Sequence, residues 1–217
     1  MSLLKHSPNF SLEEAAALAR EIYGVDATAS ALPSERDQNF LLRDRSGEKY
    51  VLKIANAMED RALLEAQQQA MERIAERAPL CQRVAPALAG DFLTEIQSAS
   101  GARHFVWMVA WLPGATLGGV KRHSPELLRD LGRRVGQIDR ALVGFDRPFD
   151  HSAIHRDFHW DLANGLSVVR EYESLIPDAE MRRLVGKLAD EFERDVAPAL
   201  PRLRKSAIHN DANDYNV

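Results

Sequence analysis

The sequence predicts an α+β protein with two lobes, an N-terminal lobe of antiparallel sheet plus helix and a helical C-terminal lobe. Residues that alternate between apolar and polar in the segments 39–54 and 91–111 indicate strands. After residue 113 the apolar periodicity is helical, and no segment there has a comparable strand pattern. We therefore divide the chain into an N-terminal lobe of residues 1–113 and a C-terminal lobe of residues 114–217.

The first helix is expected over residues 12–23. Ser11 and Glu14 have the spacing of a capping box, and Gly24 ends the apolar periodicity. The period then changes to two, and an antiparallel hairpin is expected over residues 39–54 with a Ser-Gly dipeptide in its turn.

A second helix is expected over residues 58–77, which contain no Pro or Gly and are rich in Ala, Glu, Gln and Arg. Strands at residues 91–97 and 103–111 bring the sheet to four or five strands. Pro113-Gly114 favours a turn and ends the sheet. Two long helices are expected in the C-terminal lobe, over residues 124–142 and 178–196.

The composition excludes several classes of protein. The chain carries 28 Lys and Arg against 32 Asp and Glu, a net charge of −4, which argues against nucleic acid or an anionic membrane as the main partner. Its longest uncharged apolar run, residues 105–112, is far shorter than the roughly 20 residues of a membrane helix. The single Cys81 is compatible with a reducing compartment, so we expect a cytoplasmic protein.

The end of the chain carries the most informative motif. His209, Asp211 and Asn216 form the pattern His-x-Asp followed, five residues after the Asp, by Asn. In phosphoryl transfer such an Asp accepts the proton of the attacking hydroxyl, and the Asn supplies a neutral oxygen ligand to Mg²⁺. The alternative is a polar turn rich in Asn and Asp, a composition that favours turns whatever the function.

A lysine upstream favours the catalytic interpretation. Lys53 lies among apolar neighbours on a predicted strand, where a lysine reaches the phosphates of a nucleotide placed against the sheet. The following helix offers Glu59, Glu65 and Glu72 as partners for it. Helical geometry puts Glu65 opposite the apolar face of that helix, which by itself favours a solvated side chain, so its pairing with Lys53 stays open.

This order of features is the layout of a protein-kinase-like fold, and the sequence resembles the aminoglycoside phosphotransferase and choline kinase family, most closely its hydroxylysine kinase branch. The resemblance implies that Asp211 is the catalytic base, that Asn216 is a magnesium ligand, and that Lys53 binds the phosphates of ATP or GTP. It implies that Glu65 is the partner of Lys53. The matching segments, in chain order, are residues 32–40, 50–54, 64–67, 112–114 and 208–217.

The resemblance also implies how the adenine ring and the phosphates of the nucleotide are held. The backbone near Ala110, Trp111 and Leu112 would be the hinge that binds adenine. The segment from Ser34 to Asn39 would cover the phosphates in place of a glycine-rich loop. No glycine occurs between residues 25 and 46, so phosphate contacts there would come from side chains such as these two or from ordinary backbone amides. The alternative is a polar hairpin turn.

A second His-x-Asp triplet, His155-Arg156-Asp157, does not fit the motif, because Leu162 stands five residues after the Asp and Asn164 comes two positions late. The same stretch offers a zinc-site alternative, although it lacks the Glu directly after the first His that a zinc hydrolase helix needs. The residues of that alternative are His151, His155, His159, Asp157 and Asp161.

The sequence thus predicts a small-molecule kinase that uses Mg²⁺ and transfers the γ-phosphoryl group of ATP or GTP to a hydroxyl of an amino alcohol, either hydroxylysine-like or aminoglycoside-like. The family's second acidic metal ligand is absent, so we expect residues 1–217 to be an N-terminal fragment that ends at the catalytic loop and is inactive alone. The alternatives are a non-catalytic nucleotide-binding pseudokinase module, or the N-terminal kinase domain of a protein fused to a pyridoxal-phosphate aminotransferase. The oligomeric state is left open.

Overall fold

The computed structural model describes residues 6–78, 80–145 and 161–217. The chain divides into two compact units, one of residues 1–153 with 206–217 and one of residues 154–205. The expected lobe boundary at residue 113 falls inside the first of these units, because the segments that follow it, including the C-terminal one, make contacts there. The two-lobe division stays a prediction.

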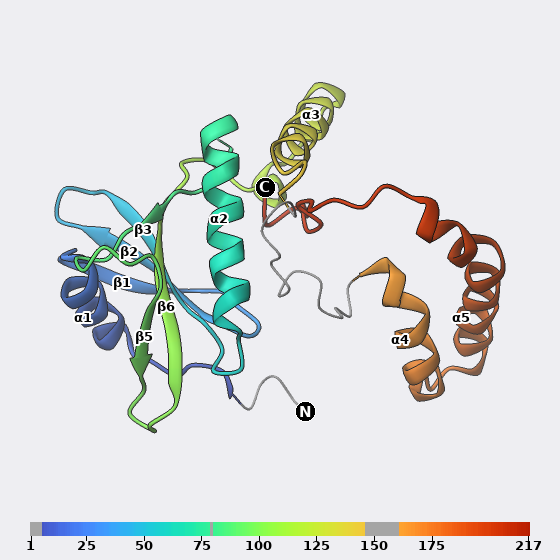
Figure 1. Cartoon of the computed structure of the whole chain (residues 1–217), viewed down its shortest axis with the longest axis horizontal. Helices are drawn as coiled ribbons and strands as arrows, with labels where there is room; N and C mark the ends of the chain where they lie inside the picture. The colour runs from blue at the N-terminus through green and yellow to red at the C-terminus, as the bar shows by residue number, and fades with distance from the viewer. Residues whose placement is uncertain (1–5, 79, 146–160) are drawn as a thin grey trace. The chain divides into compact units, whose positions relative to one another are not determined.

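The first unit contains the sheet and three helices (Figure 1). The mixed α+β class and the antiparallel N-terminal sheet are confirmed. The sheet has six strands, more than expected. The described elements of the first unit, in chain order, are α1 (Leu12–Tyr23), β1 (Ala27–Leu32), β2 (Gln38–Asp44), β3 (Lys49–Ile54), α2 (Arg61–Arg77), β4 (Val84–Ala85), β5 (Thr94–Gln97), β6 (Arg103–Ala110), the 3-10 helix η2 (Leu117–Gly119) and α3 (Pro125–Ala141).

Helix α1 begins and ends as its sequence predicts. The Ser11 hydroxyl accepts a hydrogen bond from the amide of Glu14, and the Glu14 carboxylate accepts one from the amide of Ser11. Gly24 follows the helix with φ of 71°, a left-handed conformation in which a glycine carries no Cβ penalty. The capping box and the glycine stop are therefore confirmed.

The sheet is antiparallel and places β3 at its centre. The strand order is β1-β2-β3-β6-β4, and β5 pairs with a second part of β6. Lys53 on β3 is paired with Asn39 on β2 and with Trp107 on β6. Directly paired residues of an antiparallel sheet share a face, so these three side chains lie on the same side.

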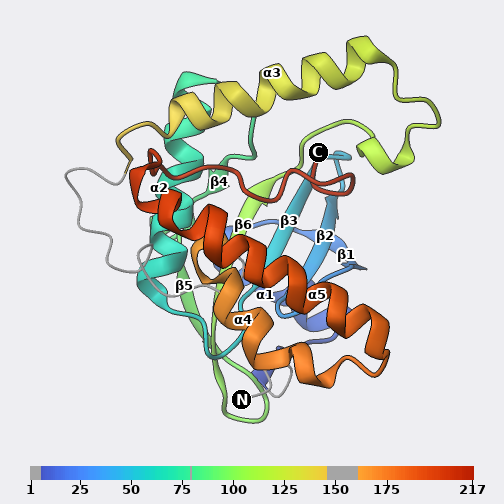
Figure 2. The ribbon, with the colours of Figure 1, turned by 90° about the vertical axis from the view of Figure 1, so that its right-hand side faces the viewer.

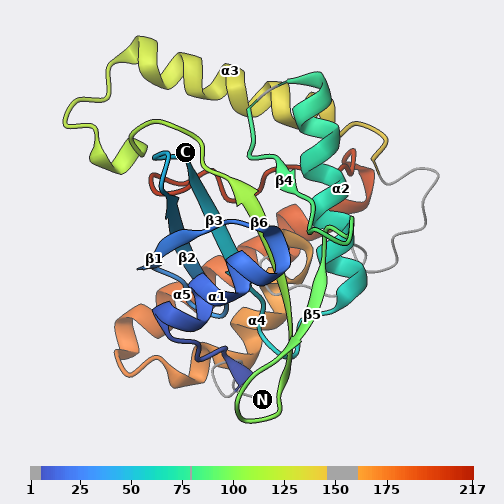
Figure 3. The same cartoon turned by 90° about the vertical axis from the view of Figure 1, so that its left-hand side faces the viewer.

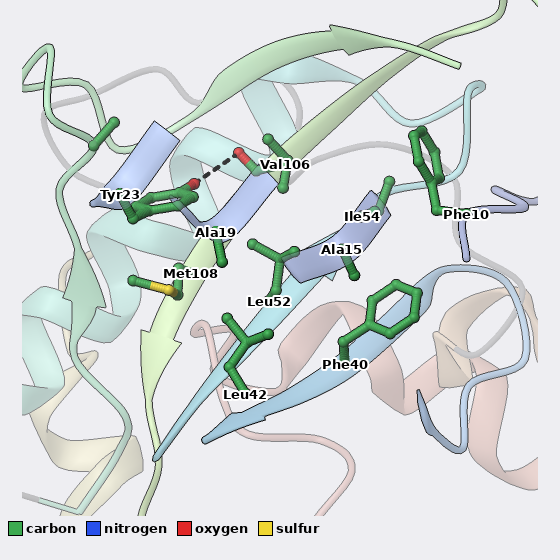
Figure 4. Packing of buried hydrophobic residues seen from close by; sticks show 11 residues of the cluster. Phe10, Ala15, Ala19, Tyr23, Phe40, Leu42, Leu52, Ile54, Val106 and Met108 are labelled. Carbon is green, nitrogen blue, oxygen red and sulfur yellow. Dashed lines mark hydrogen bonds between the residues drawn. The ribbon is translucent and has the colours of Figure 1, made fainter. Parts of the chain in front are cut away.

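Each face of the sheet packs against one helix. On one face, Phe40, Leu42, Leu52 and Ile54 pack with the buried side of α1, as Figures 3 and 4 show. The Tyr23 hydroxyl donates a hydrogen bond to the carbonyl of Val106 there, and burial raises the pKa of Tyr23. On the other face, the apolar cluster includes Leu64 of α2 together with residues of β3, β4 and β6. Its strand members are Val51, Val84, Trp107 and Val109.

Helix α3 is fastened to α2 by arginines. Arg73 of α2 donates hydrogen bonds to the carbonyls of Ala141, at 2.9 Å, and of Val143, at 2.6 Å, and Arg77 donates to Ala141 at 3.1 Å. The Ala141 carbonyl belongs to the last turn of α3 and Val143 follows the helix, so both arginines lie at the C-terminal end of α3, where cations are favourable because this end of the helix dipole is negative. Both helices agree with the sequence within a few residues.

The second unit is helical where it is described. Its main helices are α4 (Gly165–Tyr172), which the sequence did not predict, and α5 (Ala179–Glu191). The expected helix over residues 178–196 is α5 followed by a π-helical turn at Phe192–Val196. Arg170 of α4 contacts Asp190 of α5 at 2.5 Å and Glu193 at 3.2 Å. Within the described ranges, the structure contains no helix that is both long and apolar enough to span a membrane.

We expect Leu52→Ala to lower the free energy of unfolding by roughly 2–5 kcal/mol, because Leu52 is fully buried between the sheet and α1 and its truncation leaves a cavity. Urea denaturation measures this change. Leu128→Ala is the control, since that leucine is 47% exposed on α3. Equal losses in the two variants would contradict the assignment of the core.

Candidate functional site

Lys53 lies on the sheet face that α2 covers, above an aromatic ring. Its ammonium nitrogen is 5.3 Å from the ring centroid of Trp107, a distance at which a cation is attracted by the ring. Burial lowers the pKa of Lys53 from its ordinary value, and the Asp37 carboxylate opposes this shift. A mostly buried ammonium needs an anion, and a nucleotide phosphate would provide one.

The glutamates of the α2 region are paired with arginines. Glu65 accepts a hydrogen bond from Arg61 at 2.7 Å, one helical turn earlier, and its side chain is 43% exposed. Glu59 pairs with Arg36 at 2.7 Å, and Glu72 lies 3.8 Å from Arg83. In the part of the chain that the structure describes, Lys53 and Glu65 form no ion pair, and Glu65 is paired with Arg61 instead. The solvated position that helical geometry favoured for Glu65 is the one observed.

The structure separates the two side chains proposed for the phosphate-covering segment. Ser34 is exposed on the loop between β1 and β2, whereas Asn39 lies on β2 beside Lys53. The Asn39 Oδ1 oxygen is buried and has no hydrogen-bond partner among the described residues. An unpartnered buried amide oxygen next to a lysine is a polar group that a ligand would satisfy.

Sequence reasoning missed two members of this site. Asp37 supplies the carboxylate that acts on Lys53, and Trp107 supplies the ring beneath it. The signal for Asp37 was its place inside the polar segment between Ser34 and Asn39. Trp107 is identified only by strand register, because it lies far from Lys53 in the sequence.

The hinge segment leaves the sheet at the end of β6. The amide of Ala110 donates to the carbonyl of Arg83 at 2.9 Å, and the amide of Trp111 donates to Lys49 at 3.1 Å. Leu112 is 46% exposed, and its amide takes part in none of the hydrogen bonds among the described residues. Of the three predicted hinge residues, Leu112 therefore has the amide best placed to bind a base.

The C-terminal loop brings Asp211 and Asn216 into direct contact. The Asn216 side-chain amide donates to the Asp211 carboxylate at 2.6 Å, and the Asn213 side-chain amide donates to its other oxygen at 2.8 Å. Asn210 adopts φ of 22°, which turns the chain ahead of Asp211. The carboxylate is thus held by two neutral donors and stays exposed.

This donor set fits Mg²⁺. The side-chain nitrogen of Asn216 donates a hydrogen bond to Asp211. The side-chain oxygen of Asn216 is therefore the atom that remains to ligate a cation. Magnesium is commonly held by one or two protein carboxylates together with substrate phosphates and waters, and the Asn216 oxygen would add one neutral ligand to such a site. Among the described residues, no group of three or more His, Cys, Asp and Glu side chains is arranged to hold a metal.

The loop is tethered to the segment that follows the hinge. The amide of Gly118 donates to the carbonyl of Asp214 at 2.7 Å, and the amide of Leu117 donates to that of Val217 at 2.7 Å. At the other end of the loop, the amide of His209 donates to the Asp139 carboxylate of α3 at 3.2 Å. Figure 2 shows the C-terminal end on the same side of the sheet as α3.

The alternative histidine cluster cannot be placed. His151, His155, Asp157 and His159 lie outside the described residues, as does the second His-x-Asp triplet. Asp161 is described, and its carboxylate accepts a hydrogen bond from the amide of Ala163 at 2.9 Å, as an N-cap does.

Comparisons with known proteins find similar sequences and a matching family. The profile of the phosphotransferase enzyme family, APH, matches residues 28–217. Hydroxylysine kinases of Xenopus laevis and Danio rerio are 31% and 27% identical, each over 100% of this chain. The chain spans only 60% and 62% of the length of these relatives.

Solved structures show the same fold. An aminopropanol kinase associated with a microcompartment superposes with a TM-score of 0.66 at 16% identity, over 94% of this chain and 63% of its own. An amicoumacin kinase in complex with AMP-PNP and Ca²⁺ superposes with a TM-score of 0.65 at 13% identity, over 91% of this chain and 55% of its own. These likenesses confirm the kinase-like fold that the sequence predicts.

We expect Lys53→Met to raise the free energy of unfolding near neutral pH. The folded-state pKa of Lys53 is below its ordinary value of 10.5, so between these two values the unfolded state binds more protons and wild-type stability rises with pH. The advantage of the variant is therefore largest at neutral pH and shrinks as the pH approaches 10.5. Urea denaturation across this range measures it.

Lys121→Met, at an exposed position, controls for the loss of one positive charge. A pH dependence that is the same for wild type and Lys53→Met would contradict the prediction.

Proposed function

Because the chain belongs to the phosphotransferase enzyme family, we propose that the whole protein is a small-molecule kinase that uses Mg²⁺ and transfers the γ-phosphoryl group of ATP or GTP to a hydroxyl of an amino alcohol. The observation that carries this proposal is the contact between Asp211 and Asn216 in a loop tethered beside the hinge. A proton acceptor and a metal ligand are thereby held together, as phosphoryl transfer requires. We place the protein in the cytoplasm.

Each residue of the site has a role in this proposal. Lys53 binds the phosphates from the sheet, and the Leu112 amide binds the base. Asp211 orients the acceptor hydroxyl and takes its proton, while its own orientation is fixed by Asn213 and Asn216. Catalysis is then mainly positioning and neutralisation of charge.

The Asn216 side-chain oxygen would hold Mg²⁺, and the bound ion would supply neutralisation of the charge on the transferred group. The rest of the reaction rests on this chain's own side chains. Asn39, whose buried oxygen has no partner, is suited to accept a hydrogen bond from the ligand beside Lys53.

The names of the relatives support the class of acceptor that we propose. Those matched over the whole of this chain are named hydroxylysine kinases, and one structural neighbour is an aminopropanol kinase. Both names denote kinases of compounds that combine an amine with a hydroxyl group. We therefore propose a hydroxylysine-like amino alcohol ahead of an aminoglycoside.

We expect Asp211→Asn to lower kcat by about 10²–10⁴-fold, because the amide cannot accept the acceptor proton. The affinity for the nucleotide should be retained, since Asp211 does not bind its purine ring. The measurement is ATP- and GTP-dependent phosphorylation of hydroxylysine, ethanolamine, choline, homoserine and aminoglycosides by the full-length protein.

Asp214→Asn is the matched control for this experiment, because Asp214 contacts η2 through its backbone carbonyl, which the substitution leaves in place. Nucleotide binding without turnover on any acceptor, and unchanged in Asp211→Asn, would favour the non-catalytic module instead.

We expect Gly118→Ala to lower kcat by up to about tenfold, because an ångström of misplacement at a site costs about a hundredfold. A Cβ at Gly118 would lie 3.2 Å from the Asp214 carbonyl oxygen and 3.5 Å from the Tyr215 ring, so the loop must shift by a few tenths of an ångström. Gly119→Ala is the control, since its Cβ meets only the Thr116 hydroxyl, at 3.5 Å. Equal kcat values for the two variants would show that the tether does not position the loop.

A further inference from the structure

The loop that the resemblance places over the phosphates is built without glycine. It comprises residues 33–37, between β1 and β2, and no glycine occurs between residues 25 and 46. A glycine-rich loop approaches phosphates by virtue of backbone freedom, which ordinary residues lack. A loop of ordinary residues must instead be held in one conformation by contacts with its surroundings.

The buried side chain of Asn56 provides part of these contacts. Asn56, which is 1% exposed, follows β3 and lies three residues after Lys53. Its side-chain amide donates to the carbonyl of Arg36 at 3.3 Å, and its backbone amide donates to the Asp37 carboxylate at 3.0 Å. Its side-chain oxygen accepts from the amide of Met58 at 3.0 Å. One residue thus joins the loop to the segment between β3 and α2.

An ion pair completes the connection. Arg36 donates to the Glu59 carboxylate at 2.7 Å, and the Glu59 side chain is only 8% exposed, against 33% for that of Arg36. The other described pairs of comparable length are more open, such as Arg45 with Asp26 at 89% and 57% exposure. A shielded ion pair with a short contact holds its geometry better than an exposed pair, because solvent and salt screen the attraction between exposed charges.

The position of this loop affects Lys53 through the charge of Asp37. The hydrogen bond from Asn56 fixes the Asp37 carboxylate at the end of the loop, and this carboxylate acts on the Lys53 ammonium. Among the described residues, Glu65 is instead paired with Arg61. A loop that moved would carry this counter-charge away from the lysine.

We propose that Arg36, Asn56 and Glu59 form a loop clamp, which holds the loop of residues 33–37 and the Asp37 carboxylate in one conformation at the proposed phosphate site before the nucleotide binds. The three residues are positioning residues, since none is required to touch the nucleotide. The inference rests on the proposed function, because it assigns the phosphate site to Lys53. A clamp of this kind would hold a loop that has no glycine in its binding conformation, so that less conformational entropy is lost when the nucleotide binds.

The test uses the full-length protein and four variants. We expect Arg36→Ala to raise the nucleotide KM by about 10–100-fold, with the acceptor KM unchanged, because the phosphates lose a correctly placed loop. Glu59→Gln, which keeps the shape of the side chain, should raise it less. The double variant Arg36→Glu with Glu59→Arg should recover part of the loss, since it restores an ion pair in reverse. Arg45→Ala, which breaks the exposed pair, should leave the nucleotide KM unchanged.

A lower melting temperature for Arg36→Ala or Glu59→Gln, with the nucleotide KM at the wild-type value, would show a purely structural ion pair and overturn the inference. So would a raised KM in which the reversed pair gives no recovery. If Arg36→Ala does not fold, Glu59→Gln decides between these outcomes.

Failure of the proposed function is distinguishable from failure of the clamp. A wild-type protein that phosphorylates no acceptor contradicts the function, and the clamp is then tested by calorimetric binding of AMP-PNP with Mg²⁺ to the same variants. Weaker binding to Arg36→Ala than to Arg45→Ala would support the clamp, and equal binding would overturn it.

Discussion

The pairing of β3 with β6 is the interaction on which the rest of the structure depends. Successive side chains of a strand point to opposite faces, so β3 sends Leu52 and Ile54 toward α1 and Val51 and Lys53 toward α2. The apolar members of both sets are buried. Shifting the register by one residue would place Lys53 in the α1 core, where no anion could reach it, and the burial of its neighbours opposes that shift.

The same pairing sets the two ends of the proposed nucleotide site. Lys53 is opposite Trp107, and Tyr50 is opposite Ala110, where the chain leaves the sheet toward the hinge. The spacing between the lysine and the hinge is therefore a spacing along one rigid ladder. The hinge then leads directly to η2, whose amides hold the loop that carries Asp211. The site is assembled along a short path of strand, hinge and helical turn.

The Lys53 ammonium of this site has no carboxylate in an ion pair with it among the described residues. Among the described residues, Asp37 is the charged group that acts on the largely buried Lys53, whereas Glu59 and Glu65 of the α2 region are paired with arginines. Such an arrangement costs stability, because burial penalises the ammonium, and the cost is typical of binding sites that need flexibility or strain for function. The unpartnered oxygen of Asn39 adds to this cost at the same place. A nucleotide with its metal would relieve both.

The sequence by itself determined the local elements and the motif of this protein. The capping box of α1, the hairpin of β2 and β3, helices α2 and α3 and the Asp211–Asn216 spacing are set by periodicity, caps and contacts between near neighbours. Glu65 is 43% exposed on α2, as helical geometry favoured, and its pairing with Lys53, which the resemblance implies, stays a prediction. The tertiary structure alone decided that the Asp37 carboxylate acts on Lys53, that the Trp107 ring lies beneath it, and that Gly118 and Asp139 hold the C-terminal loop. These contacts join residues that are distant in the chain, and strand register and packing, which local sequence does not encode, bring them together.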